Sequence, residues 1–456
     1  MSFNSTEFLL GFLPVFILLY YVTQVRYRNI ILFVGSIFFY AYGEPVYVLL
    51  LIVSIVLNYI AAKYIGKKKK KNSRHRRGLY VCAVALNVFV LAMFKWLPVF
   101  GSRLPFADIG MPLGISFYTF QILSYLTDVY RGEIAAEHSF VKTAAYISMF
   151  PQLTSGPIVR YREVSETLKS PKMNAEDFDR GLKTFVCGLA LKVLLADRLA
   201  ILWWEIQTTG FISISTPLAW LGAFGYSLQI YFDFYGYSLM ALGLGSILGF
   251  SLPENFRMPY MADSVREFYR RWHISLKNWF QKYVYIPLGG SRKGKLRTVL
   301  NLLTVWILTA LWHGGSLNFL LWGLSLWLLI TLERALFSRW NFGKRNIPGH
   351  LYVWLVIPIT WMCFAISDLR ELGVYFGRMF GLIKGISVYS GDFEKALGNY
   401  GIFFLIGLIL CTPFPEKLYR RCRDSFLGML LLAMLFWLCI WRIQTEGNNP
   451  FMYLRF

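Results

Sequence analysis

Long apolar runs alternate with short polar or basic loops along almost the whole chain. Because a helix that crosses a bilayer needs about 20 mostly apolar residues, this pattern predicts an all-α, polytopic membrane protein. The candidate spans lie at residues 6–24, 29–42, 45–65, 79–100, 112–130, 181–204, 216–250, 298–332, 351–367, 400–412 and 425–443. The runs 216–250 and 298–332 are each long enough for more than one element. We therefore expect roughly 10–12 spans in a single membrane domain over residues 1–456.

Composition and charge support this interpretation. Of the 456 residues, 56% are hydrophobic and 16% are charged, whereas a soluble domain has about 45–50% apolar and about 25% charged residues. The formal net charge of +22 could indicate nucleic-acid binding, but the apolar fraction argues against that class of partner. Much of the Lys and Arg content lies in short loops between spans, where it reports orientation in a lipid bilayer.

The clearest basic run is "GKKKKKNSRHRRG" at 66–78, which we place in the cytoplasm because cytoplasmic loops carry the excess of Lys and Arg. Counting spans back from this loop puts the N-terminus outside. A second basic run, 416–423, is also predicted to be cytoplasmic, which would leave the C-terminus outside. The six cysteines are scattered and show no CxxC or Cys/His spacing, so we expect neither a metal site nor a disulfide framework.

The segment 251–297 is amphiphilic and separates two apolar blocks. Its aromatic and aliphatic residues recur at helical spacing, with basic residues between them: Val265, Phe268, Trp272, Leu276, Trp279 and Phe280 against Arg266, Arg270, Arg271, Lys277 and Lys282. This pattern is typical of helices that lie along the membrane surface or re-enter it, and "PLGG" at 287–290 should break the helix. A simple surface anchor explains the composition equally well.

His313 lies in "TALWHGGSLNFLLWG" (309–323), a stretch that otherwise belongs in lipid. An imidazole at that depth needs a partner or a water-filled cavity. Its near-neutral pKa suits general-base work on a hydroxyl, and the alternative is a hydrogen bond between helices. No GxSxG or HExxH motif accompanies His313, which favours direct transfer over a covalent enzyme intermediate.

Other polar residues are weaker candidates. On periodicity alone His273 is better explained as an interfacial histidine than as a catalytic one. Polar side chains at membrane depth predict a water-accessible interior, and the residues that we expect to line it are Ser116, Gln121, Gln229 and Asp233. Asp233 should be paired, for instance with an arginine of the amphiphilic segment, or should serve the chemistry.

Six stretches carry a more specific signal: "PLGISFYTFQILSYLTDVYRG" (112–132), "FPQLTSGPIVRY" (150–161), "FDFYGYSLMALGLGSILGFSLPENFRMPY" (232–260), "EFYRRWHISLKNWFQKYVYIPLGGSR" (267–292), "LTALWHGGSLNFLLWG" (308–323) and "NPFMYLRF" (449–456). Together they resemble the membrane-bound O-acyltransferase superfamily over essentially the whole chain. The most similar branch is alginate O-acetyltransferase-like, with the D-alanyl-lipoteichoic acid transfer protein as a sister.

The resemblance implies a ring of tilted and re-entrant helices around a central tunnel in a bacterial cytoplasmic membrane. His313 matches the superfamily's catalytic histidine, and His273 matches the second histidine of this branch, near the donor entrance. By analogy, an acyl donor binds from the cytoplasm and an acceptor hydroxyl is presented from outside. His313 would remove the hydroxyl proton as the oxygen attacks the acyl carbon.

The resemblance also bears on donors and partners. No tightly bound cofactor is implied, and the donor would be acetyl-CoA or an acyl-carrier thioester. A polyanionic donor would suit the basic amphiphilic segment, where the expected donor contacts are Arg270, Arg271, Trp272 and Lys277. An extracytoplasmic SGNH-type partner would complete transfer to a polysaccharide. The alternatives are D-alanyl transfer to teichoic acid, a transporter or channel, and a scaffold for the secreted partner.

Overall fold

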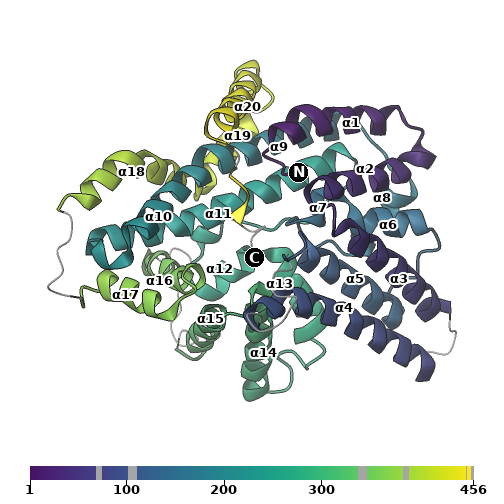
Figure 1. Cartoon of the computed structure of the whole chain (residues 1–456), viewed down its shortest axis with the longest axis horizontal. Coiled ribbons are helices and arrows are strands. Elements are labelled where there is room, and N and C mark those ends of the chain that lie inside the picture. The colour runs from purple at the N-terminus through teal and green to yellow at the C-terminus, as the bar shows by residue number, and fades with distance from the viewer. Residues whose placement is uncertain (68–73, 101–109, 337–346, 384–389, 448, 453–456) are drawn as a thin grey trace. The chain divides into compact units, whose positions relative to one another are not determined.

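Helices are the regular elements of this protein, and none of the residues that the structure describes forms a strand, which confirms the all-α prediction. The computed structural model describes residues 1–67, 74–100, 110–336, 347–383, 390–447 and 449–452 (Figure 1). Residues 68–73 of the predicted cytoplasmic loop, including Asn72, and the last four residues of the terminal motif lie outside these ranges. Contacts divide the chain into two compact units, and the single acyltransferase domain over 1–456 stays a prediction.

The first unit consists of the described residues of Met1–Leu189, Tyr237–Glu254 and Ile440–Arg455. Its helical elements are η1 (Glu7–Phe12), α1 (Leu13–Val22), η2 (Val25–Tyr27), α2 (Arg28–Gly43), α3 (Val48–Lys67), α4 (Arg74–Phe100), α5 (Ile115–Arg131), α6 (Phe140–Ser148), α7 (Phe150–Leu153), α8 (Tyr161–Lys169) and α9 (Ala175–Ala190). Helix α5 is buried along nearly its whole length. It therefore forms the interior of this unit, with no side turned to lipid.

Arg76 shows that the basic run at 66–78 is not wholly a solvated loop. Its side chain is buried, and Nε donates to the carbonyl of Ile65 at 2.9 Å. A terminal guanidinium nitrogen donates to the carbonyl of Val129 at 3.3 Å. A cation at these positions satisfies carbonyls at the C-terminal ends of α3 and α5, so Arg76 ties three helices of the first unit together.

The second unit consists of the described residues of Ala190–Gly236 and Asn255–Cys439. Its elements are η4 (Leu191–Ala196), α10 (Asp197–Thr209), η5 (Phe211–Ser213), the first part of α11 (Thr216–Ile247), η6 (Pro259–Met261), α12 (Val265–Arg271), α13 (Ile274–Phe280), η7 (Gln281–Tyr285), α14 (Lys295–His313), α15 (Leu317–Leu336), α16 (Ile347–Ala365), α17 (Leu369–Met379), α18 (Asp392–Leu410), α19 (Pro413–Cys422) and most of α20 (Phe426–Glu446). Helix α15 packs against both α14 and α16 (Figure 1).

Gly323 explains how closely α14 and α15 pack. A Cβ added at this position would lie 2.9 Å from the carbonyl oxygen of Trp306 and 3.0 Å from Cβ of Ala310. Small residues let membrane helices approach each other in this way. The close crossing fixes the end of α14, where His313 lies, against the start of α15.

Seven described helices are long and apolar enough to cross a membrane: Val48–Lys67, Arg74–Trp96, Lys295–His313, Leu317–Leu336, Ile347–Ala365, Asp392–Leu410 and Phe426–Glu446. This is the composition of a multi-pass membrane protein. The number is below the expected 10–12 because several predicted spans form shorter helices, such as α2 with 16 residues and α5 with 17. The run 298–332 forms two helices as expected, whereas 216–250 forms the single 32-residue helix α11.

The amphiphilic segment 251–297 contains two seven-residue helices, α12 and α13, followed by the short π-helix η7. Residues 286–290 form a turn, which confirms the predicted break at "PLGG". These short elements change direction several times within the second unit. His273 lies at the junction of α12 and α13, in the same compact unit as His313.

Candidate active site

His313 ends helix α14 and is buried, with 5% of its surface exposed. Four aromatic rings surround it, and we call them the His313 pocket. Their centroids lie 4.6 to 6.0 Å from that of the imidazole, and they belong to Trp312, Phe319, Trp322 and Phe364. They come from α14, α15 and α16, so His313 faces the interior of the unit although its neighbours in sequence are those of a lipid-exposed helix.

Asn318 links two of the helices that supply the rings around His313. Its side-chain nitrogen donates to the carbonyls of Cys363 at 3.2 Å and Phe364 at 3.1 Å, and its oxygen accepts from Ser316 at 2.6 Å. These bonds join the start of α15 to the end of α16 and hold the Phe364 ring in place. Sequence reasoning missed Asn318, although a buried amide five residues after the histidine in an apolar run was a usable signal.

His273 lies between α12 and α13 and is also buried, with 3% exposure. Its Nδ1 is 3.3 Å from Oδ1 of Asn255, and the Phe234 ring meets it edge-on at 4.8 Å. Burial lowers the pKa of this imidazole to about 3, so His273 is neutral at physiological pH. Periodicity favoured an interfacial histidine and did not show that the chain folds over this position and buries the ring.

Trp312 connects the two histidines. Its ring centroid lies 4.6 Å from that of His313 and 6.1 Å from that of His273. The second unit thus brings together the two residues that the resemblance singled out, with one indole between their rings.

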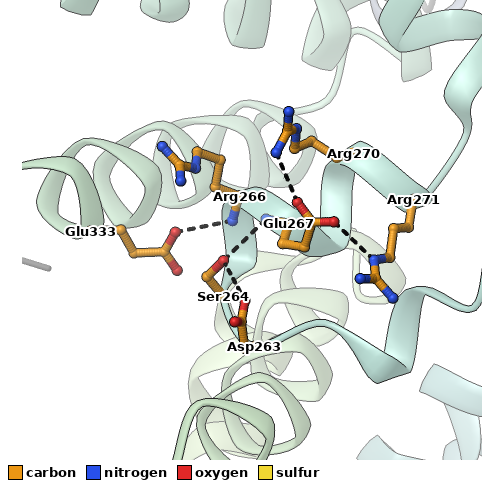
Figure 2. Close-up of polar contacts among 7 residues, drawn as sticks. All are labelled: Asp263, Ser264, Arg266, Glu267, Arg270, Arg271 and Glu333. Atoms are coloured by element: carbon orange, nitrogen blue, oxygen red, sulfur yellow. Dashed lines mark hydrogen bonds and ion pairs between the residues drawn. The ribbon is translucent and has the colours of Figure 1, made fainter. Parts of the chain in front are cut away.

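A charged cluster surrounds the short helix α12 (Figure 2). Glu333 of α15 accepts from the backbone nitrogens of Val265 at 2.6 Å and Arg266 at 3.0 Å, and Ser264 caps the same turn by accepting from the nitrogen of Glu267 at 3.2 Å. A carboxylate at a helix N-terminus satisfies donors that the helix leaves open. We call the seven residues drawn in Figure 2 the α12 cluster: Asp263, Ser264, Arg266, Glu267, Arg270, Arg271 and Glu333.

Within the α12 cluster, Glu267 binds both of the predicted donor-contact arginines. Its carboxylate oxygens lie 3.1 Å from a guanidinium nitrogen of Arg270 and 3.0 Å from Nε of Arg271 (Figure 2). Arg270 is largely exposed, whereas Arg271 is partly covered. An anionic donor at this surface would therefore compete with Glu267 for both arginines.

The other two predicted donor contacts differ from the arginines. Trp272 is buried in an aromatic core, where its ring meets those of Phe256 and Trp361, each at 5.0 Å. Lys277 is half-buried, and its pKa is lowered by burial and by the nearby charge of Arg270. Trp272 thus lies among core rings, unlike the exposed Arg270. The role of Arg270, Arg271, Trp272 and Lys277 in donor binding stays a prediction.

Asp233 is paired, but with a different residue from the one expected. Nζ of Lys192 donates to Asp233 at 2.6 Å and to Asp197 at 2.7 Å, and Lys192 and Asp233 are buried. Lys192 belongs to the π-helical element η4, whereas the example suggested from the sequence was an arginine of 251–297. The hydropathy pattern hid Lys192 because it lies in an apolar run.

Ser116 and Gln121 belong to α5 in the first unit, and Gln229 belongs to α11 in the second. All three are buried, and Oγ of Ser116, both amide atoms of Gln121 and Oε1 of Gln229 have no hydrogen-bond partner among the described residues. Buried polar atoms of this kind are normally satisfied by water or a ligand. Their role as tunnel-lining residues stays a prediction.

The described residues contain no group of three or more His, Cys, Asp or Glu side chains that could hold a metal ion. The cysteines among them are free thiols.

Comparison with known proteins gives a consistent result. Residues 47–367 match the profile of the MBOAT, membrane-bound O-acyltransferase family. The chain is 32% identical to a probable alginate O-acetylase of Pseudomonas putida, with both chains covered in full. It is 32% identical to a peptidoglycan O-acetyltransferase of Helicobacter pylori, over 85% of this chain and 81% of the relative. A teichoic acid D-alanyltransferase of Bacillus subtilis is more distant, with 26% identity over 66% of this chain and 79% of the relative.

Proposed function

The chain belongs to the membrane-bound O-acyltransferase family and is an O-acyltransferase. From that premise we propose that it transfers an acetyl group from a cytoplasmic thioester to hydroxyl groups of an extracytoplasmic polysaccharide. The alginate and peptidoglycan O-acetyltransferases among its relatives support a polysaccharide acceptor. The observation that carries the proposal is the buried imidazole of His313, enclosed by aromatic rings at the end of α14.

The proposed reaction needs one base. Nitrogen of His313 takes the proton of the acceptor hydroxyl while the oxygen forms a bond to the acyl carbon. The C–S bond of the thioester then breaks, and the leaving thiolate receives the proton, so that atoms and charge balance. An aromatic pocket around the base limits the access of water, which favours transfer to a hydroxyl over hydrolysis.

His273 is assigned to the donor side of the same centre. Its ring contacts Trp312, which also contacts His313. A substitution at His273 should therefore act on donor positioning or on acyl activation, by a route distinct from loss of the base. His273 lies at the junction of α12 and α13 and His313 at the end of α14, and both are buried among packed side chains that could hold a ligand in place.

The donor is acetyl-CoA or an acetylated carrier thioester, bound near the α12 cluster. Both donors are anionic, so the exposed basic residues of 266–293 would attract them. A tunnel through the protein, lined by Ser116, Gln121, Gln229 and Asp233, would join the donor side to the acceptor side, and a separate SGNH-type partner would pass the acetyl group to the polymer. In each unit, buried polar atoms without a partner among the described residues are compatible with bound water, as at Ser116 and Gln121 in the first and Gln229 in the second.

We further propose a place in the bacterial cytoplasmic membrane, with the N-terminus outside and loop 66–78 in the cytoplasm. Single cysteines at Ser2 and at Asn72, in a background without exposed thiols, test this orientation. An impermeant thiol reagent added to intact cells should label the first site and spare the second. The reverse pattern would invert the donor and acceptor sides.

The function itself is tested with the purified protein in lipid vesicles. Acetyl-CoA, an acetylated carrier protein and a D-alanylated carrier protein are supplied in parallel, with polysaccharide and an SGNH-type partner on the opposite side. Ester-linked acetyl groups on the polymer are the expected product. D-alanyl esters alone would favour the teichoic acid alternative, and movement of a solute without any ester would favour a transporter.

A further inference from the structure

Asn255 is bound to the His273 junction through both its backbone and its side chain. Its carbonyl accepts from the nitrogen of Ile274 at 2.9 Å, and two residues later the nitrogen of Arg257 donates to the carbonyl of Arg271 at 3.0 Å. The segment 255–257 therefore pairs with the chain on both sides of His273. Asn255 is fully buried, and its position relative to the imidazole is set by these two backbone bonds.

The backbone of His273 explains why the junction needs such support. With φ at 43°, His273 is in the left-handed region, and Met258 is the other non-glycine residue among those described that has a positive φ. This conformation is disfavoured for side chains with a Cβ. Strained residues of this kind persist where the surrounding structure holds them, and they are often found at functional sites.

The side-chain contact fixes the chemistry of the ring. Oδ1 of Asn255 lies 3.3 Å from Nδ1 of His273 and accepts from Oγ of Ser275 at 2.6 Å. An amide oxygen can only accept, so in this contact Nδ1 carries the hydrogen and Nε2 carries the lone pair. The serine hydroxyl thus gives the same amide oxygen a second hydrogen bond.

The choice between the two neutral tautomers matters because His273 is kept uncharged by burial. An imidazolium could donate from both nitrogens, whereas a neutral ring donates from one and accepts at the other. With Nδ1 turned to Asn255, the second nitrogen can accept a hydrogen bond but cannot donate one to the acyl oxygen.

We propose that Asn255 is a positioning residue that holds His273 in the Nδ1–H tautomer, so that Nε2 accepts a hydrogen bond from the acyl donor. This deepens the donor-side role of His273 and rests on the proposed function. It assigns His273 to binding the donor through an N–H or O–H group of that molecule. It excludes His273 as the donor that stabilises negative charge on the acyl oxygen.

The tautomer is measured directly on the full chain, labelled with ¹⁵N-histidine and reconstituted in bilayers. The chain has five histidines, and the signal of His273 is assigned by its loss in His273→Gln. Solid-state ¹⁵N shifts separate a protonated from an unprotonated ring nitrogen. The wild-type protein should show His273 as the neutral Nδ1–H form throughout pH 5–8.

Three variants separate positioning from folding. Asn255→Leu removes the acceptor at similar volume, and should shift His273 to the Nε2–H form and lower acyl transfer about tenfold or more, since a wrong tautomer costs rate. Asn255→Asp keeps an acceptor oxygen, and should keep Nδ1 protonated and restore most of the transfer. Ser275→Ala keeps the Asn255 contact and should leave the tautomer unchanged.

Two results would overturn the proposal: an Nε2–H form in the wild-type protein, or an unchanged Nδ1–H form in Asn255→Leu. If Asn255→Leu fails to fold, the comparison of wild type with Asn255→Asp and Ser275→Ala still decides, because a tautomer change in either of those contradicts the assignment. The ¹⁵N spectrum reports the tautomer of His273 whether or not the protein transfers an acyl group. A wild-type chain that transfers no acetyl group would therefore count against the proposed function alone.

Discussion

The His313 pocket and the α12 cluster lie in the same unit and share helix α15, which supplies Trp322 to one and Glu333 to the other. In the pocket, a single titratable ring is buried among aromatic side chains. In the cluster, charged groups neutralise one another, with Glu267 bound to two arginines and Glu333 bound to the start of α12 (Figure 2).

This difference shows which residues are available for chemistry. An exposed arginine paired with a carboxylate contributes little to stability or to donor binding, because surface ion pairs are worth about 0–1 kcal/mol. The His313 imidazole, by contrast, is buried among aromatic rings, where electrostatic interactions with a reacting group are stronger than in water. We therefore expect substitutions in the pocket to change the rate strongly, and those in the cluster to change donor affinity modestly.

His273→Gln should lower acyl transfer by about 10–100-fold, which is less than the roughly 10²–10⁴-fold typical for loss of a general base. Because burial holds the pKa of His273 at about 3, its charge does not change between pH 5 and 8. The midpoint of the pH–rate profile in that interval should therefore be the same in the variant and the wild type. A shifted midpoint would show that His273 titrates in the reaction.

Asn318→Leu should destabilise the protein by about 1–3 kcal/mol, because the buried carbonyls of Cys363 and Phe364 lose their donor. Thermal unfolding of the purified protein measures this loss. Ser316→Ala is the matched control, since it removes only the bond into the Asn318 oxygen and should have a smaller effect. Equal stability of Asn318→Leu and wild type would mean that this amide does not hold the pocket.

Arg270→Gln or Arg271→Gln should raise the KM for the donor by about two- to fivefold, as expected for partly paired surface charges, with less effect on acceptor use. The attraction should fade with salt, since the Debye length falls from about 10 Å at 0.1 M to about 3 Å at 1 M. Glu267→Gln, which releases both arginines, should act in the opposite direction. Unchanged donor affinity in both arginine variants would reduce the basic segment to a lipid-facing anchor.

Local patterns in the sequence predicted the helices, the break at 287–290 and His313 as a candidate functional residue. Apolar length is a local property, so runs such as 298–332 were found correctly. The pairing of Lys192 with Asp233, the burial of His273 and the amide bonds of Asn318 depend on residues 41, 18 and 45 positions apart. Local sequence patterns do not encode contacts between such distant residues. The burial of Trp272 could not be predicted either, because an aromatic residue in an amphiphilic helix is equally compatible with a surface and a core position.

The central claim is that the imidazole of His313 removes the proton of the acceptor hydroxyl. Acyl transfer by the purified protein is measured for wild type, for His313→Ala and for His313→Ala with added imidazole, at equal amounts of folded protein. We expect a fall of about 10²–10⁴-fold in the variant, with partial recovery when imidazole enters the vacated position. Transfer by His313→Ala at the wild-type rate would remove His313 from the chemistry.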